Sequence, residues 1–119
     1  SLMRNAKTRA LSKGKSVEID RRFVVEKLEN GICEATGFKF VIGVSGGRGK
    51  INPFSPSLDC IEANEGYTVG NTQVVCSMYN VGKNKHSELD FKAMCLAVAL
   101  RNMGDQAVHA RMLQLLLGA

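Results

Sequence analysis

The chain has no tryptophan and few other aromatic residues, with two tyrosines and five phenylalanines among its 119 residues. Its hydrophobic fraction is 45%, which is enough for a core, so we expect that core to be mostly aliphatic. No apolar run approaches the roughly 20 residues that a membrane-spanning helix needs. The first residues also lack the apolar stretch of a signal peptide, which favours a cytoplasmic location. Ser1 and Leu2 ahead of Met3 are interpreted as a cloning remnant.

Acidic residues are in the minority: 11 aspartates and glutamates face 16 lysines and arginines, which gives a net charge of +5. A basic balance favours a polyanionic partner. The basic residues concentrate in three segments, and none of these faces an apolar helix stripe with aromatic anchors, so nucleic acid is favoured over a membrane surface. The candidate nucleic-acid-binding residues are Arg4, Lys7, Arg9, Lys13 and Lys15 near the N-terminus, Arg48 and Lys50 in a glycine-rich loop, and Lys83 and Lys85.

Hydrophobic periodicity and turn residues predict a mixed α+β chain of about one domain. Helices are expected at 3–13, ended by Gly14, and after Asp20 as N-cap up to Asn30-Gly31. Two short strands are expected within 32–42 around a Thr36-Gly37 turn, followed by an irregular loop to residue 56. Strands at 57–61 and 72–76 precede three helices, at 77–84 with Ser77 as cap, at 88–103 with Ser87 as cap, and at 105–117.

The most informative stretch runs from residue 33 to residue 85. It contains Cys33-x-x-Thr36-Gly37, then Ser57-Leu58-Asp59-Cys60-Ile61-Glu62, then Gly66-Tyr67-Thr68-x-Gly70-Asn71, Val75-Cys76 and Asn80-x-x-Lys83. In order, spacing and turn residues it resembles the HNH (ββα-metal, His-Me finger) endonucleases, especially small phage and prophage members. The resemblance implies a hairpin and a short helix around one divalent metal, flanked by N- and C-terminal helices, in a protein of a bacterial host cell.

The resemblance assigns roles to individual residues. Asp59 and Asn80 would hold Mg²⁺ or Mn²⁺, since carboxylate and amide oxygens suit hard cations. Asn71 would tie the intervening loop through bonds to backbone groups. The family's base histidine follows the aspartate, and here that position is Cys60, a poor base for water. Glu62 and His86 are the alternative candidates for the base.

Four cysteines, Cys33, Cys60, Cys76 and Cys95, are expected to be thiols or metal ligands rather than disulfides. Many HNH proteins carry two Cys-x-x-Cys knuckles that hold zinc, and the resemblance places Thr36 and Tyr79 at their second cysteines. Two thiolates make a poor tetrahedral zinc site, so no structural zinc is expected. Cys33 and Cys76 are instead predicted to be neighbouring buried thiols, with Phe38, Phe40 and Tyr79 packed around them. Cys95 is expected in the core.

The sequence therefore predicts a single HNH-like nuclease domain over 1–119, with basic helices at 1–31, the ββα-metal core at 32–85 and C-terminal helices at 86–119. Two functions stay open: a metal-dependent endonuclease cutting DNA, most simply double-stranded, and a non-catalytic nucleic-acid-binding module with the same fold. A third interpretation is a small interaction protein that forms a homodimer through the C-terminal helix, whose apolar residues are Met112, Leu113, Leu115, Leu116 and Leu117.

Overall fold

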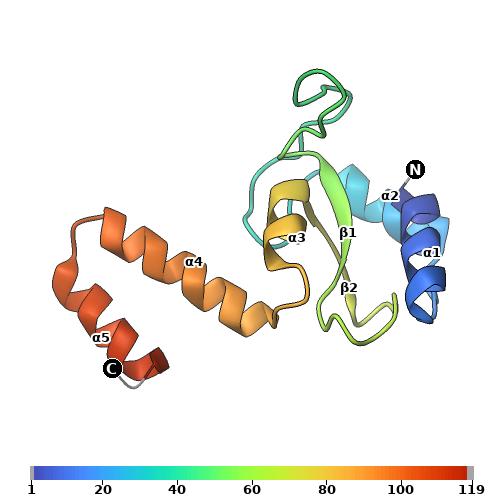
Figure 1. The fold of residues 1–119 in the computed structure, drawn as a ribbon. Coiled ribbons are helices and arrows are strands. Elements are labelled where there is room, and N and C mark those ends of the chain that lie inside the picture. Colours follow the sequence, from blue (N-terminus) through green and yellow to red (C-terminus); the bar gives the residue numbers. More distant parts are fainter. Residues whose placement is uncertain (1, 118–119) are drawn as a thin grey trace. The chain divides into compact units, whose positions relative to one another are not determined.

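The fold is α+β, with five helices and one two-stranded sheet in the part of the chain that the computed structural model describes, residues 2–117 (Figure 1). The side chains of Leu116 and Leu117 lie outside the described residues. The chain divides into two compact units, Ser1–Lys85 and His86–Ala119. The extent of a single domain over 1–119 stays a prediction. In chain order the elements are α1 (Leu2–Lys13), α2 (Arg21–Asn30), β1 (Pro56–Cys60), β2 (Thr72–Cys76), α3 (Ser77–Lys83), α4 (Glu88–Asn102) and α5 (Gln106–Leu117).

The second helix begins and ends where its capping residues predict. The Asp20 carboxylate accepts a hydrogen bond from the Phe23 amide at 2.9 Å, which satisfies one free N–H at the start of α2. Gly31 follows the helix with a left-handed φ of 73°, and its amide bonds the Lys27 carbonyl. A residue with a Cβ is strained in that conformation, so glycine fits this position best.

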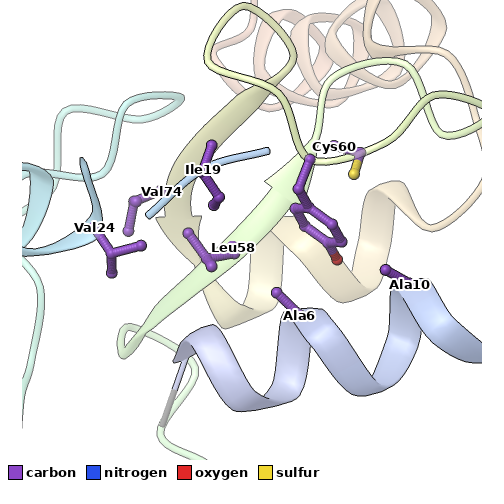
Figure 2. Packing of buried hydrophobic residues seen from close by; sticks show 8 residues of the cluster. Ala6, Ala10, Ile19, Val24, Leu58, Cys60 and Val74 are labelled. Atoms are coloured by element: carbon purple, nitrogen blue, oxygen red, sulfur yellow. The ribbon is translucent and has the colours of Figure 1, made fainter. Parts of the chain in front are cut away.

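The sheet is an antiparallel hairpin whose two faces carry different helices. The register pairs Leu58 with Val74 and Asp59 with Gln73. Because side chains alternate along a strand, Leu58 and Val74 share one face with Cys60. Figure 2 shows that face packed against Ala6 and Ala10 of α1, with Ile19 and Val24 closing the cluster. Asp59 and Ser57 project to the other face, where α3 lies.

Small residues let α1 approach the sheet closely. Ala6 and Ala10 are four positions apart, so they lie on one side of the helix, and both are almost completely buried. Among the basic residues of α1, Arg4, Lys7 and Lys13 are exposed, whereas Arg9 is half-buried and donates to the Leu58 carbonyl of β1. The alanines therefore anchor the helix, and Arg9 extends from it to the sheet.

The segment between α2 and β1 is less regular than predicted. In place of two strands there is one antiparallel bridge, between Ile32 and Lys39. In the turn between them, the Gly37 amide donates a hydrogen bond to the Cys33 carbonyl at 2.9 Å. Phe38 is 54% exposed and meets Phe54 edge-on, so it does not shield the cysteines as predicted. The loop beyond it extends away from the hairpin (Figure 1).

The start of α3 also differs from prediction. Ser77 is the first helical residue, and the capping position belongs to Cys76, which makes no side-chain capping bond. The Ser77 hydroxyl instead donates to the Ser55 carbonyl at 3.2 Å, tying the helix to the residue before β1. A tertiary partner thus replaces the local cap.

The second unit consists of α4 and α5, which contact each other. Ser87 caps α4 as predicted, accepting from the Asp90 amide at 3.0 Å. Several large apolar residues of α4 are exposed, namely Leu89, Met94, Leu96 and Val98, and Cys95 is exposed as well, which corrects its predicted place in the core. Two helices alone offer too little apolar surface to cover each other. No helix among the described residues is long and apolar enough to cross a membrane.

Candidate functional site

A pocket of about 330 Å³ opens along the free edge of β1. This strand pairs with β2 on one side only, so the carbonyls of its other edge need separate donors. Arg9 from α1 and Asn80 from α3 both donate to the Leu58 carbonyl, at 3.1 and 3.0 Å. The two helices therefore border the edge from both sides. The lining residues are Arg9, Lys13, Lys15, Leu58, Asp59, Cys60, Ala63, Tyr67, Asn80, Val81 and Asn84.

Asp59, the predicted metal ligand, is buried in the pocket wall with 4% of its surface exposed. Gln73 lies directly opposite on β2 and donates to Asp59 Oδ2 at 2.9 Å. Lys83 Nζ donates to Asp59 Oδ1 at 3.2 Å. Each oxygen of the carboxylate therefore has a donor from the protein, and one of these donors carries a full positive charge.

The position of Lys83 corrects a prediction. Its side chain is 0% exposed, so it does not reach out to a phosphate as expected. Lys83 follows Asn80 by three residues on α3, which turns both side chains towards the sheet. Its ammonium also donates to the Cys60 carbonyl at 2.7 Å. A buried charge is tolerated only with such partners, and Lys83 has both a carboxylate and a carbonyl.

Asn80 lines the same pocket as Asp59. Its amide nitrogen donates to the Ser57 hydroxyl at 2.7 Å and to the Leu58 carbonyl. These bonds fix the side-chain amide against β1. The structure thus brings together the two residues that the sequence pairs, although they are 21 positions apart.

Asn71 ties the loop between the strands, as its assigned role requires. Its oxygen accepts from the Glu62 amide at 2.8 Å, and its nitrogen donates to the carbonyls of Glu62 and Gly66 at 3.2 and 2.9 Å. Gly66 itself passes so close to Ser16 that a Cβ would lie 2.5 Å from the serine oxygen. Asn71 and Gly66 therefore shape the end of the pocket without lining it.

Cys60, at the position of the family's base, is a protonated thiol at neutral pH. Burial raises the pKa of the Cys60 thiol, Lys15 opposes this rise, and the negative charge of Asp59 adds to it. The thiol also forms a hydrogen bond with Tyr67. Burial likewise raises the pKa of the Tyr67 hydroxyl. Neither side chain is poised to take a proton from water.

The other two candidates for the base lie elsewhere. Glu62 is exposed and is absent from the residues that line the pocket. His86 is exposed and is the first residue of the second unit. The pocket wall, as far as the structure describes it, contains no histidine and no carboxylate other than Asp59.

Three of the nine predicted nucleic-acid-binding residues, Arg9, Lys13 and Lys15, line the pocket. Arg9 lies 6.0 Å from the centre of the Tyr67 ring, and Lys15 donates to the Ala63 carbonyl. Arg9 Nε is buried and, in the described structure, has no hydrogen-bond partner. An unsatisfied buried donor of this kind is costly to the fold. The remaining exposed members are Arg4, Lys7, Arg48, Lys50 and Lys85.

Cys33 and Cys76 are buried neighbours, since the Cys76 amide donates to Cys33 Sγ at 3.2 Å. Burial opposes ionisation of Cys33, but hydrogen bonds from the Thr36 side chain and from backbone amides lower its pKa overall. Burial raises the pKa of Cys76, and the charge of Cys33 adds to this effect. Tyr79 is buried, in accord with its predicted place.

As arranged, the pocket does not fit Mg²⁺ or Mn²⁺. A hard cation needs several free oxygen ligands, and Asp59 already accepts from Lys83 and Gln73. The ammonium of Lys83 occupies one side of the only carboxylate in the pocket wall. No group of three or more His, Cys, Asp or Glu residues gathers anywhere in the described chain.

Two residues of this site escaped the sequence reasoning. The sequence assigns Gln73 only to a strand, and it gives Tyr67, which lies within the Gly66-Tyr67-Thr68 motif, no role of its own. A register that pairs Leu58 with Val74 places Gln73 opposite Asp59, so the hairpin pattern did contain a signal for Gln73. Tyr67 offered no comparable signal, because its place depends on how the loop returns to Ser16, where the Tyr67 amide bonds the Ser16 carbonyl at 3.0 Å.

No protein-family model matches the chain, and no curated protein matches it. Among solved structures, the chain is similar to the rare-cutting HNH restriction endonuclease PacI. The TM-score is 0.62 at 17% sequence identity, over 87% of this chain and 79% of that one. A likeness at this identity shows the fold alone. The predicted fold class is thereby confirmed: this chain has an HNH-like ββα core, formed by β1, β2 and α3, with helices flanking it.

Proposed function

We propose that this chain binds the phosphate backbone of DNA, with a phosphate seated in the pocket between α1 and α3. The observation that carries the proposal is the pocket's charge: three cationic side chains, Arg9, Lys13 and Lys15, surround one carboxylate that Lys83 already neutralises. The guanidinium of Arg9, which lines the pocket, offers a cationic donor to a phosphate oxygen. Contacts of this kind hold the backbone without reading sequence.

Binding is better supported than cleavage by the residues themselves. Hydrolysis of a phosphodiester needs a base to activate water, and the thiol at that position keeps its proton. It also needs stabilisation of the leaving oxygen, which a metal commonly supplies, and Asp59 is already paired with Lys83. The chain therefore fits a binding module that keeps the fold and lacks the chemistry.

The second candidate is a metal-dependent endonuclease that uses Mg²⁺ or Mn²⁺. One specific observation favours it, since Asp59 and Asn80 line the same pocket, as the resemblance requires. The similar solved structure is, by its description, a restriction endonuclease that perturbs DNA. This function would require Asp59 and Lys83 to part before the carboxylate gained a free oxygen.

The binding test is a fluorescence anisotropy titration of a labelled duplex at several salt concentrations. Lys13 is the best residue to change, because it is exposed and lines the pocket. Lys13→Gln should weaken binding and lower the slope of log affinity against log salt by about 0.9, the effect of one lost phosphate contact. Lys39→Gln is the control, since Lys39 is exposed and does not line the pocket. Equal effects of the two variants would contradict the proposed place of binding.

A nicking assay on supercoiled plasmid separates the two candidates. The binding module retards DNA and leaves it intact in Mg²⁺ or Mn²⁺. Nicking that Asp59→Ala abolishes would support the endonuclease instead.

A further inference from the structure

The ion pair between Asp59 and Lys83 lies entirely inside the first unit. Lys83 is 0% exposed and Asp59 is 4% exposed. The ammonium donates to the carboxylate at 3.2 Å and to the Cys60 carbonyl at 2.7 Å, while Gln73 donates to the second carboxylate oxygen at 2.9 Å. Buried charges persist only when their hydrogen bonds are made in this way, so the pair is a built feature of the fold.

A fixed cation at this place changes what the carboxylate can bind. A divalent ion approaching Asp59 would meet the positive charge of Lys83 at close range, which repels it. Displacing Lys83 would leave an ammonium without its counter-ion in a place where the side chain is 0% exposed. A metal at Asp59 would therefore have to compete with the charge of Lys83, although the carboxylate lines the pocket.

We propose that Lys83 takes the electrostatic place of a divalent cation at Asp59, so that this site holds phosphate without metal. The inference rests on the proposed phosphate binding in the pocket. An ionised carboxylate alone would repel a phosphate, and a bound metal would reverse that repulsion. Here the built-in ammonium cancels the charge of Asp59, and Arg9, Lys13 and Lys15 supply the surplus that attracts the anion.

The direct test measures Mn²⁺ binding by electron paramagnetic resonance in the whole chain. The wild-type protein and Asp59→Asn should bind Mn²⁺ equally weakly, because Lys83 competes for the carboxylate. Lys83→Met removes the ammonium and keeps an unbranched side chain, so Mn²⁺ affinity should rise roughly 10- to 1000-fold, by analogy with the roughly 1–3 units by which one opposite charge shifts the pKa of a carboxyl. The double variant Lys83→Met with Asp59→Asn should lose that gain. Mn²⁺ binding by the wild type that Asp59→Asn removes would overturn the inference.

DNA binding in EDTA and in Mn²⁺ distinguishes this inference from the proposed function. Wild-type affinity should be the same in both. DNA binding that needs Mn²⁺ and Asp59 overturns the inference and leaves DNA binding intact. A protein that binds neither DNA nor Mn²⁺ refutes the proposed function, and the metal result still supports a carboxylate held by Lys83. If the variants fail to fold, the wild-type protein decides the question alone: its DNA affinity should be the same in EDTA and in Mn²⁺, and DNA binding that needs Mn²⁺ would overturn the inference.

Discussion

The buried pair of Asp59 and Lys83 also makes a quantitative prediction about stability. Asp59→Asn leaves an ammonium in the interior without its counter-ion, and Lys83→Met leaves a carboxylate with only the Gln73 amide as donor. Removing one partner of a buried pair costs about 3–5 kcal/mol. Lys83→Met additionally removes the bond to the Cys60 carbonyl, so its cost should lie at the upper end of this range.

The double variant should cost much less than the sum of the two single variants. Once both charges are absent, no uncompensated ion remains in the interior, and methionine is of similar length to the lysine stem. We expect the two changes to couple by about 2–3 kcal/mol, near the upper limit for residues in contact. The assay is urea unfolding followed by circular dichroism, with all four proteins compared at one pH and one salt concentration.

A surface pair at nearly the same distance provides the control. Arg22 and Glu26 are joined at 3.1 Å, but their side chains are 86% and 64% exposed. Water screens such a pair, and its coupling should stay at about 0.3–0.5 kcal/mol. Equal coupling in the two pairs, or additive effects at Asp59 and Lys83, would refute the claim that burial makes the inner pair energetically important.

Three further predictions concern the loop and the thiol beside the site. Gly66→Ala should destabilise the fold by about 1–3 kcal/mol, since its Cβ would lie 2.5 Å from Ser16 Oγ. Gly70→Ala is the control, because a Cβ there has open space around it and should have little effect. Thermal melts of the two variants make the comparison. Asn71→Ala removes three hydrogen bonds and should cost about 2–4 kcal/mol in urea unfolding; a loss below about 0.5 kcal/mol would show that these bonds are not important. Because burial raises the pKa of Cys60, the folded state keeps this proton where the unfolded chain has lost it, so stability should fall as pH rises above the ordinary thiol pKa of about 8.5. Cys60→Ala should make the melting temperature fall less steeply between pH 8 and pH 10, and an unchanged slope would contradict this origin.

Local signals in the sequence predicted the elements that depend on near neighbours. Asp20 and Gly31 bound α2 because their bonds reach only three or four residues along the chain. The strand at Thr72–Cys76 has the predicted bounds, since a β-branched run between turn residues has few alternatives. These features could be derived before any tertiary contact was known.

Features that depend on distant partners were the ones predicted wrongly. Ser77 looked like a helix cap, but its hydroxyl donates to the Ser55 carbonyl instead. Cys95 looked like a core residue, because the apolar side of a helix does not say whether a partner covers it. The expected strands around Thr36-Gly37 reduce to one bridge, between Ile32 and Lys39. For Ser77 the deciding contact lies 22 positions away in the sequence, outside the window that predicts a cap.

Lys83 shows most clearly why the chemistry of a site cannot be derived from charge counts. A lysine near another lysine and two asparagines reads as exposed surface, because burial of an ammonium is rare without a counter-ion. The counter-ion lies 24 positions earlier, on the strand that α3 covers, and only the packing of α3 on the hairpin brings the two together. The thiol at Cys60 and the ammonium at Lys83 then have a common consequence. On the proposed function, the first leaves the pocket without a group that would activate water, and the second occupies the carboxylate that would hold a metal, so the pocket would bind a phosphate without cutting.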